Sequence, residues 1–214
     1  MPSKNSVKIY AESSYYHVYN RGVEGRNIFG DHQDYRVFLS FIKRYLLPPT
    51  LNEVRPRWKQ DLAYSLELKC YTLMPNHFHF LIRLINKNAL TIFMRALMDS
   101  YVKFFNKKYK REGGLFQGKF KAVLVENDIY LLHLTRYIHL NPLKIGIPLK
   151  MLEDYYCSYG EFIGKRNTEW IKPKEILDNF GSSLVKKDSV TSYRDFVEKY
   201  EDDSENLLDG LMLE

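Results

Sequence analysis

Hydrophobic and polar positions alternate along residues 14–22, SYYHVYNRG, with the period of a half-buried β-strand. From residue 32 to residue 46 the apolar positions instead recur at the spacing of an amphipathic helix. Two prolines, at positions 48 and 49, cannot continue that helix and predict its end. The pattern therefore predicts a strand followed by a helix.

The remaining pattern completes an α+β order. Further strands are predicted at about 63–73, 77–84 and 117–126, and further helices at about 89–109 and from 127 or 128 to 141. The order β-α-β-β-α-β, followed by a helix, predicts a ferredoxin-like or RRM-like antiparallel sheet with helices packed on it. Beyond residue 150 two short helices are expected, which would form a C-terminal helical extension.

Composition excludes several classes of protein. Of the 214 residues, 45% are hydrophobic and 27% are charged, as in ordinary globular proteins and unlike disordered chains. No run approaches the roughly 20 apolar residues of a membrane span, so no membrane partner is expected. Cys70 and Cys157 lack metal-type spacing, which favours reduced packing residues and a cytoplasmic location.

Charge is distributed unevenly. The segment 102–121 holds seven basic residues against one acidic residue, interleaved with phenylalanine and tyrosine, whereas residues 195–214 hold eight acidic residues against Lys199. A basic block with aromatic side chains fits a polyanion whose bases can stack. A solvated helix face followed by a hairpin would explain the same segment equally well. Charge alone therefore does not decide between nucleic-acid binding and an ordinary solvated surface.

Two histidines stand at alternate positions in the otherwise apolar strand MPNHFHFLI. Because side chains alternate in a strand, His77 and His79 share one face and Phe78 points to the other. Two imidazoles roughly 7 Å apart on one face can hold a single divalent ion. Two structural histidines would give the same pattern, so the pair by itself does not decide between a metal site and packing.

A second group of polar residues follows some 60 residues later, in HLTRYIHLNP. His133, Tyr137 and Asn141 are spaced by four and therefore share a helix face. Pro142 disfavours further helix, which places Asn141 at the C-terminal end. Taken singly, Tyr137 also fits a half-buried core aromatic, and Asn141 also fits an ordinary helix-end residue.

Five segments together resemble a known family. YHVYNRG, MPNHFHFLI, GGLFQGKFKAVLVEND, YLLHLTRYIHLNP and YYCSYGEF occur in the order found in single-tyrosine HUH transposases of bacterial insertion sequences. The resemblance is greatest to the REP-associated tyrosine transposases and covers about residues 14–163. It implies a transposase domain at 1–163 and a lineage-specific, partly helical acidic tail at 164–214.

The resemblance implies a role for each polar residue of the two motifs. His77 and His79 match the histidine pair that binds the metal, and Tyr137 matches the nucleophile. Asn141 falls where the family places a third metal ligand, often glutamine, and the implied cofactor is Mg²⁺ or Mn²⁺. Asparagine is shorter by one methylene, which implies a metal closer to the helix or a water in one coordination position. For His133, packing or a phosphate contact is expected rather than proton transfer.

The implied function is that of a single-stranded DNA transposase and endonuclease. It would recognise DNA hairpins of the REP type and would cleave and rejoin strands through a 5′-phosphotyrosine. A nucleoid-associated cytoplasmic protein, either monomer or homodimer, is expected. The residues expected to contact DNA are Asn20, Arg21, Lys103, Lys107, Lys108, Lys119, Lys121 and Arg136. For Arg136, a surface salt bridge is the competing interpretation.

Three other functions fit parts of the sequence. A relative of transposases that binds structured single strands without cleaving them would keep the basic segment but has no need of His77, His79 and Tyr137 together. A nucleotide phosphoesterase would require a second histidine pair, which the segment 17–19 does not supply. A structural ferredoxin-like module would leave the order of the five segments unexplained.

Overall fold

The structure is a computed structural model and describes residues 10–49, 61–181 and 189–199. Its main elements are β1 (Tyr15–Arg21), α1 (His32–Leu46), β2 (Leu66–Met74), β3 (His77–Leu84), α3 (Ala89–Tyr109), β4 (Lys121–Val125) and α4 (Asp128–Leu140). The four strands form one sheet in the order β2-β3-β1-β4, and every neighbouring pair is antiparallel. The predicted ferredoxin-like α+β fold with a C-terminal helical extension is confirmed.

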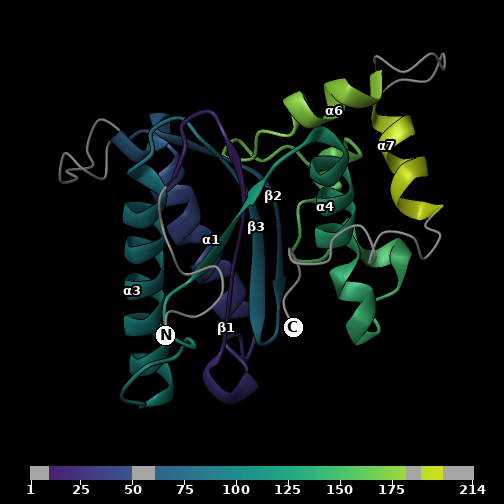
Figure 1. The fold of residues 1–214 in the computed structure, drawn as a ribbon. Coiled ribbons are helices and arrows are strands. Elements are labelled where there is room, and N and C mark those ends of the chain that lie inside the picture. The colour runs from purple at the N-terminus through teal and green to yellow at the C-terminus, as the bar shows by residue number, and fades with distance from the viewer. Residues whose placement is uncertain (1–9, 50–60, 182–188, 200–214) are drawn as a thin grey trace.

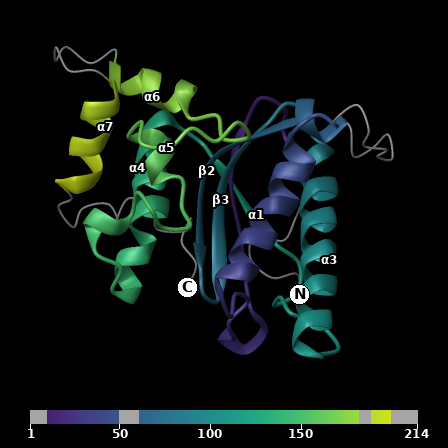
Figure 2. The ribbon, with the colours of Figure 1, turned by 180° about the vertical axis from the view of Figure 1, so that it is seen from behind.

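Helices cover both faces of the sheet. Figure 1 shows α1 and α3 on one face and α4, with the C-terminal helices, on the other, and Figure 2 shows the same arrangement from behind. Each face has its own hydrophobic core, because alternate residues of every strand point to opposite sides. Phe78 and Phe80 belong to the core under α1 and α3, whereas Leu81 and Tyr137 belong to the core under α4.

The predicted bounds hold best where the chain carries explicit stop and start signals. Helix α1 spans His32–Leu46, as predicted, because Asp31 and Asp34 form a capping box at its start and prolines follow its end. Strand β4 is shorter than the predicted 117–126. It begins only at Lys121, since Gly118 adopts a positive φ of 70° that ordinary strand residues avoid.

The register between β1 and β3 decides which side chains meet. Arg21 lies opposite His77, and Tyr19 lies opposite His79. These four residues therefore share the sheet face that α4 covers, together with His17. This face, at the end of β1 and the start of β3, is where the sequence motifs converge.

The C-terminal segment packs against β2 and α4. Its elements are η3 (Asn141–Ile145), η4 (Leu149–Met151), α5 (Tyr159–Phe162), α6 (Lys174–Gly181) and α7 (Ser189–Glu198). His139 of α4 anchors it through contacts of 2.7 Å with the Tyr193 hydroxyl and 2.8 Å with the Ser158 hydroxyl. The division of the chain at residue 163 stays a prediction, and most of the acidic segment 195–214 lies outside the described residues.

Within the described ranges, no helix is long and apolar enough to cross a membrane.

Candidate active site

Strand β3 presents the two histidines at its first and third residues. The ring centroids of His77 and His79 lie 4.9 Å apart with an angle of 87° between the rings. His77 is partly buried and His79 is completely buried. Burial lowers the pKa of His77 to about 4 and that of His79 well below its usual value, so both rings are neutral at pH 7. A neutral imidazole is the form that binds a metal ion.

Helix α4 brings Tyr137 onto this pair. The Tyr137 ring centroid lies 5.4 Å from that of His79, and only 8% of the residue is exposed. Lys144, in the 3₁₀ turn after α4, places its ammonium 5.1 Å from the centre of the tyrosine ring. The hydroxyl-bearing ring, the two histidines and a cation therefore meet at one point of the α4 face.

Asn141 lies where α4 gives way to η3, one helical turn after Tyr137. Its side-chain amide donates a hydrogen bond to the Tyr137 carbonyl at 3.1 Å. The Asn141 side chain also hydrogen-bonds to the His77 ring, which partly offsets the effect of burial on the His77 pKa. The side chain is shorter than that of glutamine, yet it reaches His77 directly.

Each histidine has one ring nitrogen held by a protein partner. His77 Nδ1 lies 2.7 Å from the Asn76 amide oxygen, which can only accept, so Nδ1 carries the hydrogen and Nε2 keeps its lone pair. His79 Nδ1 lies 2.9 Å from His17 Nε2, and both residues are completely buried. Metal-binding histidines are commonly oriented in this way through their second nitrogen.

One buried nitrogen of the His77–His79 pair has no hydrogen-bond partner among the described residues. This atom is Nε2 of His79. Such an atom is costly unless a ligand uses its lone pair. Two imidazole nitrogens and an amide oxygen form a donor set that suits Mn²⁺ or Mg²⁺, so His77, His79 and Asn141 fit the expected ion. The described residues contain no metal-type group of three or more His, Cys, Asp or Glu side chains.

The contact between His17 and His79 gives a testable expectation. Replacing His17 by phenylalanine should lower Mn²⁺ affinity about 10- to 100-fold. A His79 ring that binds the ion through Nε2 would donate from Nδ1 to His17 Nε2, and the change removes this acceptor. Isothermal titration calorimetry on the metal-free protein measures this. His17→Gln retains an acceptor and should recover much of the affinity, and exposed His32→Phe serves as the control. Equal affinity in wild type and His17→Phe would contradict this role.

Several residues expected to contact DNA lie near the pair. Arg21 faces the same side as His77, its charge contributes to lowering the His77 pKa, and its guanidinium donates to the Gln117 side chain. Lys121 lies beside Tyr19 with its ammonium 6.0 Å from the ring centre. Both lie on the sheet face that carries His77 and His79.

Other expected DNA contacts are placed elsewhere. Asn20 is buried on the opposite face of the sheet, where it donates to the Gly118 carbonyl. Arg136 points towards α7 rather than the site, donates to the Phe196 carbonyl at 3.2 Å and stacks on that ring. His133 contacts the same arginine and the same ring, so it lies in this packing rather than beside Tyr137.

The lysines of α3 also differ from one another. Lys103 and Lys107 are exposed. Lys108 is instead engaged with the carboxylates of Asp31 and Asp34, at 2.7 and 2.6 Å, at the start of α1. A contact of Lys108 with DNA would have to displace these ion pairs, which favours a structural role for Lys108.

Sequence reasoning did not find His17 and Lys144 as parts of the site. The position of His17 on the same strand face as Tyr19 and Arg21 was readable, but its pairing with His79 depends on the register of two strands. Lys144 follows Pro142, which predicts the end of α4; the chain continues as a 3₁₀ turn that carries the lysine back over Tyr137.

Comparisons with known proteins show which family this chain is similar to. Residues 50–141 match the family described as "Transposase IS200 like", a range that contains both histidines, Tyr137 and Asn141. Over this range the chain is similar to the IS200-like transposases, the family that its motifs resemble.

Within this class the similarity extends to the REP-associated tyrosine transposases. A putative member from Haemophilus influenzae is 29% identical over 121 residues, which are 51% of this chain and 68% of that protein. The solved structure of such a transposase bound to a REP hairpin has a TM-score of 0.53 at 15% identity. The match covers 80% of this chain and 98% of that one, and it shows a common fold.

Proposed function

We propose that this protein is a single-tyrosine DNA transposase that cleaves and rejoins single-stranded DNA next to hairpins through a 5′-phosphotyrosine. The observation that carries the proposal is the convergence of Tyr137 and Asn141 from α4 on His77 and His79 from β3. These residues are separated by about 60 positions in the sequence, and a purely structural histidine pair has no need of a tyrosine and an amide beside it.

Tyr137 supplies the nucleophile in this proposal. Its hydroxyl oxygen attacks the scissile phosphorus, the bond from phosphorus to the 3′ oxygen breaks, and the phenol proton is finally carried by the departing 3′-hydroxyl. One phosphate ester replaces another, so the reverse attack by a 3′-hydroxyl rejoins the strand without a nucleotide cofactor. The ammonium of Lys144 near the Tyr137 ring would stabilise negative charge that develops on the phenol or the phosphate.

His77, His79 and Asn141 would hold the divalent ion. When bound there, Mg²⁺ or Mn²⁺ supplies a Lewis acid for a non-bridging oxygen of the scissile phosphate. The protein's own contribution is orientation: Asn76 and His17 fix the two imidazoles, and the Tyr137 carbonyl fixes the Asn141 amide. The unsatisfied nitrogen of His79 supports this assignment.

The proposed substrate is a single strand that flanks a hairpin. A duplex would bury the scissile phosphate and its neighbouring bases, whereas an unpaired strand can enter beside Tyr137. The hairpin-bound structural neighbour supports this choice of partner. Arg21 on β1 and Lys121 on β4 are the proposed contacts closest to the site. Lys119 continues the basic surface in the segment before β4, and Lys103 and Lys107 continue it along α3.

Salt dependence tests the lysine contacts. The double change Lys119→Ala and Lys121→Ala should reduce the slope of log affinity against log salt by about 1.4, since each lost single-strand phosphate contact removes about 0.7. Fluorescence anisotropy with a labelled hairpin between 50 and 300 mM salt would measure this, a range that spans roughly physiological ionic strength. The control alters two exposed lysines of the C-terminal segment, Lys150 and Lys165. The same slope in both variants would remove Lys119 and Lys121 from the interface.

The direct test of the function is a cleavage assay on single-stranded hairpins with unpaired flanks. With Mn²⁺ or Mg²⁺ the protein should cut one strand and remain covalently attached to the 5′ end, and a chelator should prevent both. A denaturing gel separates free DNA, cut DNA and the adduct. Hairpin binding without scission or adduct under both metals would instead support a non-cleaving single-strand-binding protein derived from a transposase.

A further inference from the structure

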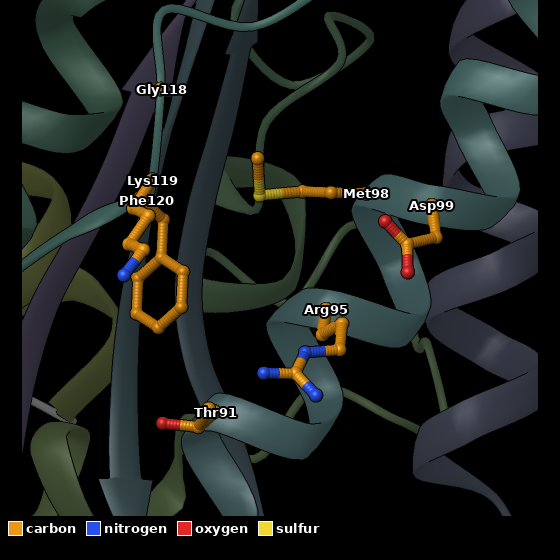
Figure 3. Close-up of a pocket in the computed structure, with 7 residues that line it drawn as sticks. All are labelled: Thr91, Arg95, Met98, Asp99, Gly118, Lys119 and Phe120. Carbon is orange, nitrogen blue, oxygen red and sulfur yellow. The ribbon is translucent and has the colours of Figure 1, made fainter.

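A cavity of about 280 Å³ lies between α3 and the segment that leads into β4. It belongs to the sheet face opposite Tyr137, because Phe120 packs in the core under α1 and α3. Figure 3 shows the segment 118–120 on one side and α3 on the other, with Arg95 and Met98 extending from the helix towards the space between them. The cleavage reaction proposed above makes no use of this cavity.

The cavity is tied to the end of β1 that also borders the proposed metal site. The Asn20 side-chain amide donates to the Gly118 carbonyl at 3.3 Å and lies 3.9 Å from the Met98 sulfur. The next residue, Arg21, lies opposite His77 in the sheet and accepts a backbone hydrogen bond from Gln117 at 2.8 Å. The segment 117–121 therefore runs around the sheet edge from the metal site to the cavity.

Lys121 marks the other end of this path. It pairs with Tyr19 across the β1–β4 register, and the Tyr19 ring centroid lies 6.0 Å from that of His79. A DNA strand lying on the Tyr137 side thus needs only to pass this edge to bring a neighbouring nucleotide to the cavity.

The walls of the cavity combine an aromatic surface with uncommitted charges. Phe120 and Met98 provide an apolar, polarisable wall. Arg95, Asp99 and Lys119 are exposed, and none of them makes an ion pair with another residue in the described parts of the chain. Lys108, on the same helix as Arg95, has both its carboxylate partners in place. An apolar wall with a few polar or charged groups is the usual lining of a small-ligand site.

We propose that this cavity binds one unpaired nucleobase that carries an exocyclic amino group, from the same strand that Tyr137 cleaves. The inference rests on the proposed function and adds a specificity site to it. Phe120 and Met98 contact the face of the base, the Asp99 carboxylate accepts from its amino group, and Arg95 and Lys119 face the adjoining phosphates. The volume is just below the roughly 300 Å³ at which pockets for larger ligands begin, which fits a single base.

The chemistry of the walls selects against other occupants. A phosphate in the cavity would lie beside the Asp99 carboxylate and against an apolar wall, both unfavourable for an anion. Thymine presents its single ring N–H between two carbonyl oxygens that repel a carboxylate. Cytosine, adenine and guanine each offer an amino group, so thymine is the base that the cavity should reject.

A binding selection tests this inference. Hairpins with randomised unpaired flanks are selected on the full protein, and the bound pool is sequenced. At one flank position thymine should be depleted. In a selected hairpin, thymine or an abasic residue at that position should weaken wild-type binding about tenfold. In Asp99→Ala the thymine penalty should disappear while the abasic penalty remains, and in Phe120→Leu the abasic penalty should shrink. Asp178→Ala, an exposed helical aspartate of α6, serves as the control.

The outcomes separate this inference from the proposed function. No base preference at any flank position, or a thymine penalty unchanged in Asp99→Ala, would overturn the nucleobase site. Covalent adduct formation is measured on the same hairpins. A base preference at one flank position without any covalent adduct would support the nucleobase site and contradict the cleavage function. Adduct formation without any base preference would support the cleavage function and contradict the nucleobase site.

Discussion

Tyr137→Phe is expected to abolish strand cleavage and the covalent protein–DNA adduct while leaving hairpin affinity within about twofold of wild type. The change removes one oxygen and keeps the ring that packs beside His79 and Lys144. Because that oxygen forms the new bond to phosphorus, no other described group of the site replaces it, and cleavage should fall at least about a thousandfold. Denaturing gels with 5′- and 3′-labelled hairpins measure both products.

Tyr130→Phe is the matched control, since Tyr130 is a partly buried tyrosine on the same helix. It should retain full cleavage. An adduct of unchanged yield in Tyr137→Phe would show that another residue is the nucleophile, and loss of hairpin binding in that variant would show that the phenol hydroxyl contributes to recognition instead.

The order of elements and the face of each strand were readable from the sequence. The His-x-His pattern fixed a shared face for His77 and His79, and the four-residue spacing fixed one for Tyr137 and Asn141. That the two faces meet depends on the packing of α4 across β2, β3 and β4, which no local pattern encodes. In the sequence, only the family resemblance indicates that the histidine pair and the helix face of Tyr137 and Asn141 form one site.

Two residues expected to contact DNA, Arg136 and Asn20, lie away from the site because of the elements that pack beside them. Arg136 follows the same helical pattern as its neighbours, yet it faces α7, whose position depends on contacts between residues far apart in the sequence. The family resemblance implies DNA contacts for both Asn20 and Arg21, although adjacent strand residues point to opposite faces. That separation places Asn20 against Gly118 and Met98, which line the cavity beside α3, and it places Arg21 opposite His77.

Asn141 reaches His77 although its side chain is one methylene shorter than the glutamine often found at this position in the family. Asn141 continues directly from α4 into η3 with helical dihedral angles, so its side chain projects from the last turn of the helix towards His77. Its amide group is held by the Tyr137 carbonyl, which couples the orientation of the proposed third ligand to the backbone of the proposed nucleophile. A displacement of α4 would therefore move both groups together.

Loss of the metal site should be visible without any DNA. At a Mn²⁺ concentration 100 times the dissociation constant, binding should stabilise the wild-type fold by about 2.7 kcal/mol. For a domain of this size that corresponds to a rise in melting temperature of roughly 5–10 °C. His79→Ala removes the nitrogen that is buried without a partner, and the rise should vanish in this variant. Differential scanning fluorimetry with and without Mn²⁺ measures the effect.

Two further variants test whether loss of the Mn²⁺ effect in His79→Ala reflects loss of a ligand or a damaged fold. His77→Ala alters the partly buried member of the pair and should also lose the Mn²⁺-induced rise, whereas exposed His32→Ala should keep it. Metal-dependent cleavage should fall at least a hundredfold in both site variants, with hairpin affinity in chelator unchanged because the DNA contacts lie on other residues. A full Mn²⁺-induced rise in folded His79→Ala would contradict the assignment of His79 as a ligand, since loss of a true ligand weakens Mn²⁺ binding and with it the stabilisation that binding provides.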